Sequence, residues 1–516
     1  MEYWLILLSI VIGAFGIHYL FRNYNFFKRH DVIHMPSVPI LGSMTSLVFY
    51  KISFADFLYK LYNFNPEAKY FGFYATTTPI FLLRDPEIIK SILVKNFEAF
   101  PNRHGFNDLN DPLLSNNLVS LHGQKWRNVR TLLSPSFTSS KMKMMFNLMS
   151  ECAVDFANFF FTSLPMEKCD VDIKDAFAKY TNDVIATCAF GIKINSMKDP
   201  MNKFYTYGKE AADISGIRNF KFIFLRTFPT LARTLNVKLV ENYLSDFFKD
   251  IIKTTIATRD AENIVRPDMI QLMMDIRGTE GQRKLNIDDM IAQAFIFFLG
   301  GLDTASTALS FAAYTLAVNP DVQNKLRQEI DKALEESNGK VTYETINQLQ
   351  YLDLVISETL RLYPPVLFLE RICDKAYELP PALPGEKPFI MKKGMTFWIP
   401  TFAIHRDAKY YDDPEKFDPE RFLDNKIYHN SPYMPFGLGP RMCIAKRFAM
   451  LEIKIVLFHL LARCELKPCA KTSLPLKFSK TSFSVQPEDG FWLNVQRRSD
   501  MNSILESLIT NDVTNS

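Results

Sequence analysis

The sequence predicts a mainly α-helical fold with a smaller β portion around one large core. Apolar residues recur at helical spacing in several long stretches. Between Lys51 and Arg498 no Gly/Ser linker, low-complexity tract or charge block interrupts the chain, so one core fits better than several domains. Pro364 and Pro365 break one helical stretch and force an extended segment after it. The helical stretches are residues 122–133, 286–309, 351–362 and the segment that follows Cys443.

Composition narrows the functional classes. The formal net charge of the 516 residues is only +4 and 22% of them are charged, which is too balanced for nucleic acid to be a general partner. The 7 cysteines are an odd, scattered set, unlike the dense even pattern of a secreted disulfide scaffold. We therefore expect the body of the protein to face a reducing compartment.

The N-terminal segment is predicted to anchor the protein in a membrane. Tyr3 to Phe21 is almost wholly apolar and long enough to cross a bilayer as a helix. No basic region precedes this run and no clear small-residue cleavage site follows it, which favours an uncleaved anchor over a cleaved signal peptide. Arg22, Lys28 and Arg29 follow the run and, by the positive-inside rule, leave the body on the cytosolic side. The predicted parts are an anchor (1–22), a basic, proline-containing hinge (23–50), a globular body (51–498) and a polar tail that is a candidate for disorder (499–516).

Residues 122–133 carry a candidate anion-binding pair. Trp126 and Arg130 are four apart, so on a helix they share one face. An indole N–H beside a guanidinium can donate to a carboxylate or another anion. Such pairs more often belong to a solvated surface or a local packing contact, so the pattern alone leaves the function open.

The apolar stretch over 286–309 contains an unusual insert. Gly300-Gly301-Leu302-Asp303-Thr304 places two glycines, a carboxylate and a hydroxyl in a stretch whose apolar residues predict a buried helix. Glycine costs about 1 kcal/mol relative to alanine in a helix, and a buried carboxylate needs a partner. Two interpretations remain: a kinked structural helix, or a helix opened beside a ligand with an acid and a hydroxyl for proton delivery.

Residues 351–362 contain a candidate ion pair. Glu358 and Arg361 are three apart and can meet on one helix face. Their apolar neighbours suggest burial, and a buried pair needs further hydrogen bonds to be tolerated.

The most informative stretch runs from Phe436 to Ala445. Two glycines and Pro440 shape a tight loop, and Cys443 falls near the start of an apolar helix, where the positive end of the dipole favours thiolate over thiol. Arg441 can face an anion. An inert buried thiol is the ordinary alternative; zinc lacks a second ligand nearby, and no base is identified for a cysteine nucleophile. The residues favour a metal or haem thiolate over these alternatives.

From Pro36 to about Arg498 the sequence resembles the cytochrome P450 family. The stretch from Phe436 to Cys443 looks like the family's haem-binding loop. Glu358 and Arg361 look like its paired Glu and Arg, and Arg421, in the run Phe417-Asp418-Pro419-Glu420-Arg421-Phe422, looks like their third partner. The three motifs in this order are very specific. The resemblance implies the cytochrome P450 fold, with residues 51–498 as a haem-thiolate catalytic domain.

The resemblance also implies roles for single residues. Haem b would be the cofactor, with Cys443 as the axial ligand of its iron and Phe436 in the haem-binding loop. Thr304 and Asp303 would deliver protons during oxygen activation. Two positions depart from the family's usual pattern: Ala445 replaces a glycine near the expected haem plane, and Ala305 replaces a second hydroxyl residue, so the proton relay depends more heavily on Thr304. The residues implied to bind the haem propionates are Trp126, Arg130, Arg371 and Arg441, with Arg103 as a fifth.

The anchor, the hinge and the single haem loop look like those of microsomal members, which face the cytosol from the endoplasmic reticulum membrane. No flavin or nicotinamide fingerprint is visible, so electrons from NADPH would come through a separate NADPH-cytochrome P450 reductase, with cytochrome b5 as a second candidate partner. Four basic residues expected near the thiolate face could attract an acidic reductase, although scattered solubilising charge is as good an explanation for each. They are Lys125, Arg127, Lys446 and Arg447.

Short runs of the sequence are similar to those of insect members of the family that act on plant toxins, pheromones and insecticides. An apolar xenobiotic, hormone or pheromone is therefore the expected substrate, oxidised with O2. The alternatives are a haem-thiolate isomerase or dehydratase that acts on peroxides, and a haem sensor or hydrophobic-ligand carrier without turnover. We expect Phe220, Phe222, Phe224 and Phe228 to cluster in a loop that contacts the membrane or a substrate channel. The expected pocket residues, with core packing as the alternative for each, are Phe297, Phe298, Gly301, Val366, Leu367 and Phe368.

Overall fold

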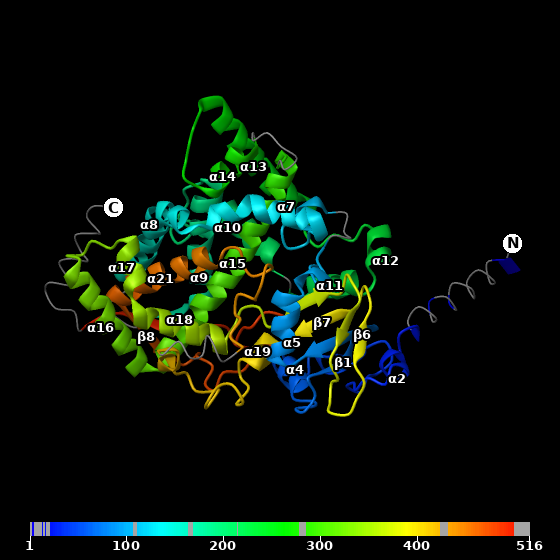
Figure 1. The fold of residues 1–516 in the computed structure, drawn as a ribbon. Coiled ribbons are helices and arrows are strands. Elements are labelled where there is room, and N and C mark those ends of the chain that lie inside the picture. Colours follow the sequence, from blue (N-terminus) through cyan, green and yellow to red (C-terminus); the bar gives the residue numbers. More distant parts are fainter. Residues whose placement is uncertain are drawn as a thin grey trace.

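Helices make up most of the described chain, as the sequence predicted, and small sheets supply the β portion (Figure 1). The computed structural model describes residues 21–106, 111–163, 169–213, 215–277, 285–423 and 432–499, together with Tyr3, Trp4, Gly13 and Gly16. The predicted anchor thus lies almost entirely outside the described residues, and so does the predicted tail beyond Ser499.

The helices differ widely in length. In chain order they are α2 (Phe26–Arg29), α3 (Thr45–Val48), α4 (Phe54–Tyr62), α5 (Pro86–Lys90), α6 (Pro112–Ser115), α7 (Gly123–Leu133), α8 (Ser139–Ser163), α9 (Ile173–Ile185), α10 (Lys203–Ala212), α11 (Ile217–Thr227), α12 (Pro229–Thr234), α13 (Asn242–Glu262), α14 (Met269–Arg277), α15 (Ile287–Val318), α16 (Pro320–Glu336), α17 (Tyr343–Gln348), α18 (Gln350–Leu362), α19 (Thr401–Ile404) and α21 (Lys446–Arg463).

Three sheets form in the part of the chain that the structure describes. The first has the order β1-β2-β7-β4, in which β2 and β7 are parallel and the other pairs are antiparallel. The second has the order β3-β9-β8, and β5 pairs with β6 in the third. The strands are β1 (Tyr70–Ala75), β2 (Thr78–Leu83), β3 (Cys169–Asp172), β4 (Leu369–Ile372), β5 (Tyr377–Leu379), β6 (Phe389–Met391), β7 (Thr396–Ile399), β8 (Cys464–Pro468) and β9 (Trp492–Arg497).

Helix α15 is the central element of the helical part. It begins at a capping box in which Asn286 and Asp289 bond each other's backbone amides, and it ends before Pro320, which opens α16. In Figure 1 it lies between α9, α10, α18 and α21. Among the described helices it alone is long and apolar enough to cross a membrane, but 61% of its most apolar window is buried inside the protein. That burial marks it as a core helix.

The segment expected to be a hinge packs on the first sheet. The ring of Phe27 is fully buried and lies so close to Gly72 that a Cβ there would collide with it. Backbone hydrogen bonds join Gly72 to Ile33 at 2.7 Å and to Met35 at 2.8 Å. The packed body therefore begins before Lys51, because the apolar residues of this segment cover strand β1.

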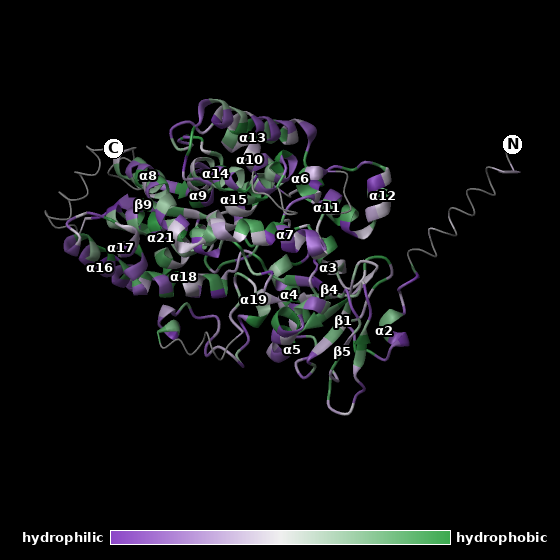
Figure 2. Ribbon diagram, turned by 45° about the horizontal axis from the view of Figure 1, so that its top comes forward, coloured by the Kyte–Doolittle hydropathy of each residue, from purple (hydrophilic) through white to green (hydrophobic). Residues whose placement is uncertain are grey.

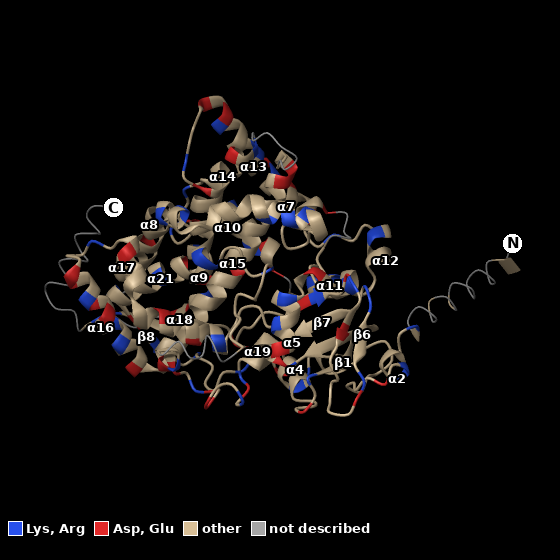
Figure 3. Cartoon of the chain, in the orientation of Figure 1, with Lys and Arg blue, Asp and Glu red and all other residues tan. Residues whose placement is uncertain are grey.

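Buried apolar residues form two clusters, a large one that includes Phe73 and Trp398 and a smaller one that includes Phe27, Phe81 and Phe397, whereas the sequence suggested one core. Figure 2 shows hydrophobic residues along the central helices and the first sheet. Figure 3 shows lysine, arginine, aspartate and glutamate mixed over the outer helices. This arrangement agrees with the balanced charge of the sequence.

Candidate active site

The loop before α21 is shaped by two glycines. Gly437 and Gly439 have φ angles of +76° and +71°, a left-handed conformation that other residues adopt only at a cost. A Cβ on Gly439 would also collide with the carbonyl group of Leu93. Within the loop the amide of Cys443 donates to the carbonyl of Phe436 at 2.8 Å. The loop therefore holds Cys443 in one defined position.

Cys443 is exposed as a residue, although protein surrounds much of its thiol. This burial raises the pKa of the thiol, while the amide of Ala445 and the charges of Arg130, Arg103 and Lys446 lower it. The helix begins three residues after Cys443, at Lys446, so its dipole lies farther from the sulfur than the sequence suggested. A cation bound to the sulfur would lower the pKa of this thiol and favour the thiolate.

Four arginines from distant parts of the chain gather near this thiol. Burial, together with the charges of Arg103 and Arg130, lowers the pKa of Arg441 to about 8. Burial likewise lowers the pKa of Arg103 to about 10. The pKa of Arg371 is held well below its ordinary value by burial and by the charges of Arg103 and Arg441. An anion among these side chains would relieve their mutual repulsion.

Two of these arginines carry buried donors without a hydrogen-bond partner. They are Nε and Nη2 of Arg371 and Nε of Arg103. Buried donors are normally paired, and leaving one unpaired costs about 1–3 kcal/mol. The donor set therefore fits a ligand that carries carboxylates.

Arg441 is differently placed, because its guanidinium already donates to backbone carbonyls. It bonds Pro101 at 2.9 Å, Leu121 at 2.6 Å and Leu118 at 3.3 Å, and it lies 4.1 Å from the centre of the Trp126 ring. Trp126 is buried as the platform for this charge. The structure thus brings the predicted arginine and tryptophan together, with Arg441 tying the loop to the chain before α7.

On α15 the two glycines have different surroundings. A Cβ on Gly300 would meet nothing within 4 Å, whereas one on Gly301 would lie 2.7 Å from the Ile185 side chain of α9. Gly301 therefore permits close packing of α15 against Ile185, and its place in a substrate pocket stays a prediction. The Thr304 hydroxyl donates to the carbonyl of Gly300 at 2.5 Å, so the open face of the helix is that of Gly300 and Thr304.

Asp303 has a partner that sequence reasoning missed. The ammonium group of Lys174, on α9, lies 2.9 Å from its carboxylate and also donates to the Asp303 carbonyl and to the hydroxyls of Ser306 and Thr307. The requirement for a partner was readable from the sequence, but no local pattern indicates which lysine supplies it. Ala305 is buried in the helix packing.

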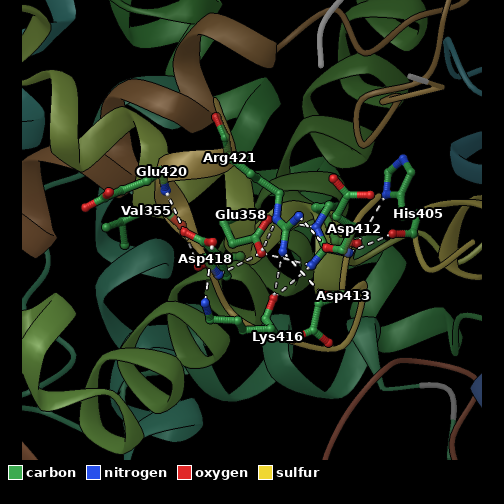
Figure 4. A network of polar contacts seen from close by, with 12 residues as sticks. Val355, Glu358, His405, Asp412, Asp413, Lys416, Asp418, Glu420 and Arg421 are labelled. Carbon is green, nitrogen blue, oxygen red and sulfur yellow. Dashed lines mark hydrogen bonds and ion pairs between the residues drawn. The ribbon is translucent and has the colours of Figure 1, made fainter. Parts of the chain in front are cut away.

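The structure brings Glu358, Arg361 and Arg421 together. Figure 4 shows Glu358 and Arg421 within this network. Arg361 makes two hydrogen bonds to the Glu358 carboxylate, at 2.7 and 2.9 Å, and Arg421 adds one at 3.0 Å. The amide of Asp418 donates to the same carboxylate at 2.9 Å. Glu358 and Arg361 are completely buried, and these additional bonds satisfy the condition set by the sequence.

His405 links this network to the loop that carries Cys443. Its carbonyl accepts from Arg361 at 2.8 Å, and its Nε2 accepts from the amide of Met434 at 3.0 Å, two residues before Phe436. Accepting at Nε2 requires a neutral ring, and burial lowers the pKa of His405 to about 3. No sequence pattern pointed to this histidine.

The remaining predicted pocket residues divide between pocket and core. Phe297 shares the face of Thr304, because seven residues make about two helical turns, and it packs on Phe137 at 5.6 Å. Phe298 points about 100° away and is buried against Phe248 and Phe204, so it belongs to the core.

After α18, the three predicted pocket residues differ in exposure. Val366 is 46% exposed, Leu367 is buried, and Phe368 packs against Trp398 at 4.1 Å. Packing on the first sheet therefore occupies Phe368.

The phenylalanine cluster expected in a loop is largely helical. Phe220, Phe222 and Phe224 lie in α11, and Phe228 follows its end. Phe220, Phe224 and Phe228 are spaced by four, the helical period that the loop prediction overlooked. Phe220 is 52% exposed, whereas Phe222 and Phe224 are half-buried.

The four basic residues expected to attract a reductase differ in how free their side chains are to meet a partner. Lys125, Lys446 and Arg447 are exposed, and Arg447 bonds the carbonyl of Phe137 at 3.4 Å. Arg127 forms an ion pair with Glu98 at 2.5 Å. The charges lie on α7 and at the start of α21.

Comparison with known proteins identifies the family. The family model described as cytochrome P450 matches residues 34–494. The chain is 42% identical to cytochrome P450 9e2 of Blattella germanica over 96% of this chain and 97% of that protein. It is 36% identical to cytochrome P450 6k1 of Blattella germanica, covering 93% of this chain and 94% of that protein. It is 34% identical to probable cytochrome P450 9f2 of Drosophila melanogaster, covering 95% and 98%. The chain therefore belongs to the cytochrome P450 family of haem-dependent monooxygenases and is similar to its insect members.

Proposed function

We propose that the protein is a membrane-anchored monooxygenase of the endoplasmic reticulum that oxidises an apolar small molecule with O2 and with electrons from NADPH, delivered by a separate reductase. The observation that carries this proposal is the Cys443 thiol beside buried arginine donors without partners. A thiolate ligand and a set of arginines that can bind carboxylates are the contributions expected of a protein that forms a haem-thiolate site. Haem, when bound, supplies the chemistry in which one oxygen atom enters the substrate and the other leaves as water.

The residues divide this work between two sides of the site. Cys443 would bind the iron, and Arg371 and Arg103 would donate to the propionates, with Arg130 contributing charge. Arg441 and Trp126 would hold the loop and the arginine cluster in place.

On the opposite side, Thr304 would hold a proton for the reaction. Its hydroxyl lies on the open face of α15 and, in the structure, donates to the carbonyl of Gly300. Asp303, ion-paired with Lys174, would resupply that proton. Phe297 and Val366 are the predicted apolar residues that remain available to a substrate.

Thr304→Ala should separate electron use from product formation. With reductase, NADPH and a bound substrate, the wild type should form oxidised product, whereas the variant should consume NADPH but release peroxide, with product per NADPH lower by on the order of tenfold. Thr315→Ala is the matched control, because that buried hydroxyl bonds only backbone carbonyls on the same helix. Normal coupling in Thr304→Ala would contradict the relay role, and the absence of substrate-dependent NADPH use by the wild type would favour a carrier or sensor.

Exposed apolar residues support the membrane orientation. Ile217 and Phe220 on α11 are 72% and 52% exposed, and Leu231 and Leu235 at α12 are 48% and 61% exposed. Figures 1 and 2 place α11 and α12 on the side of the molecule where α2 also lies. This surface would rest on the lipid beside the anchor.

Deleting Met1 to Arg22 should move a large fraction of the protein from the membrane pellet to the supernatant. The haem content should stay unchanged, because the deletion stops before the buried Phe27. Fractionation and the absorbance of the haem measure the two outcomes. Unchanged sedimentation with membranes, or loss of haem on deletion, would argue against a separable anchor.

A further inference from the structure

Helix α11 spans the two sides of the candidate site. Its Phe222 ring lies 6.0 Å from Phe106, three residues after Arg103, and 6.0 Å from Phe483. Ser484, the next residue, has its hydroxyl 3.5 Å from the carboxylate of Asp303. Figure 1 shows α11 where the helical part meets the first sheet. The helix therefore contacts one segment that leads to Arg103 and another that reaches Asp303 on α15.

One ion pair ties α11 to the sheet beneath it. Arg226, at the end of α11, lies 2.5 Å from the carboxylate of Glu370 on β4. The arginine side chain is 32% exposed and the glutamate side chain only 8%. Glu370 directly precedes Arg371, whose buried donors fit a carboxylate ligand. Helix α11 is thus attached to the strand that carries Arg371.

The surroundings of Glu370 keep its carboxylate hydrogen-bonded when this pair opens. The amide of His104 donates to one carboxylate oxygen at 3.0 Å, and the indole of Trp398 donates to the other at 3.2 Å. Both donors belong to the body and would remain when Arg226 leaves. Arg226 itself would enter water. Breaking a fully buried pair would instead strand a charge at high cost.

We propose that the Arg226–Glu370 ion pair is a latch that holds α11 closed and that its release admits bulky apolar ligands to the site. In the closed state Phe222 packs between Phe106 and Phe483 as an aromatic cover. The latch thereby selects against ligands too large to pass while it is shut. This inference rests on the proposed haem site, since that site is what the latch would close.

The chain offers a matched control on the same helix. Lys221 forms an ion pair with Glu241 at 2.9 Å, and its side chain is 33% exposed, like that of Arg226. Glu241 directly precedes α13, so this pair does not reach the sheet. Lys221→Gln removes one charge and one ion pair from α11 but leaves the latch intact.

The experiment compares two iron-binding probes in the haem-loaded full chain. Clotrimazole is an imidazole that carries bulky aromatic rings, and imidazole itself is small; stopped-flow absorbance of the haem reports the binding of both. In Arg226→Gln we expect clotrimazole to associate about three- to tenfold faster, because a charge-assisted hydrogen bond is lost, while imidazole associates at the wild-type rate. Raising the salt concentration should speed clotrimazole binding in the wild type but not in the variant.

Hydrogen exchange supplies a readout that does not depend on the haem. The amides of α11 should exchange faster in Arg226→Gln than in the wild type or in Lys221→Gln. Equal association rates of clotrimazole in Arg226→Gln and the wild type would overturn the latch. The latch would also be overturned if Lys221→Gln accelerated clotrimazole binding as much as Arg226→Gln does. A wild type without the thiolate-type carbon monoxide spectrum would instead overturn the proposed function, so the two failures are distinguishable.

Discussion

Cys443→Ser should abolish the thiolate-type carbon monoxide spectrum of the reduced protein. A serine hydroxyl occupies the same place in the loop, but it is far less acidic than a thiol and donates much less electron density to iron. Monooxygenase activity should be lost with the spectrum. Reduced, carbon monoxide-treated protein measured by absorbance gives the result directly.

The control for this substitution is Cys469→Ser. Cys469 follows β8 and contacts Thr472, away from the loop before α21. Its replacement should leave the carbon monoxide spectrum unchanged. If Cys443→Ser kept the thiolate-type spectrum, another residue would have to be the ligand and the proposed site would be abandoned.

Glu358→Gln should lower the free energy of unfolding by about 3–5 kcal/mol, the usual cost of removing one partner from a buried ion pair. Two buried guanidinium groups, those of Arg361 and Arg421, would lose their carboxylate. Because His405 connects Arg361 to the chain just before Phe436, we also expect haem to be bound less firmly. Denaturant unfolding and haem content measure the two effects.

The matched control is Glu420→Gln, one residue from Arg421. Glu420 pairs with Lys325 at the surface, where both side chains are about half exposed. An exposed pair contributes at most about 1 kcal/mol, so the control should be nearly neutral. Equal stability of Glu358→Gln and Glu420→Gln would show that the buried network does not support the fold.

The sequence was sufficient for features that depend on neighbours along the chain. Helical period placed Glu358 beside Arg361, and the glycines before Cys443 indicated a tight loop, because both follow from local backbone geometry. The third partner, Arg421, lies far along the chain, and only resemblance to a family could indicate it. The same resemblance supplied the haem assignment, which the residues alone left among alternatives.

Two predictions failed because the helical spacing of the residues was not applied to them. The cluster around Phe222 was expected in a loop although its spacing fits a helix, and Phe298 was expected in a pocket although it lies about 100° from Phe297. Which side of a helix faces a ligand depends on what packs against the other sides. That information comes from distant segments such as α10 and α13.

By itself the sequence determined the helical class, the cysteine loop and the buried pair on α18, since short-range hydrogen bonding and turn geometry decide these. Only the tertiary structure decided the pairing of Lys174 with Asp303, the attachment of Arg226 to Glu370, and the upward pKa shift of Cys443. Each of these depends on side chains that are far apart in the sequence, and only folding of the chain brings them close together.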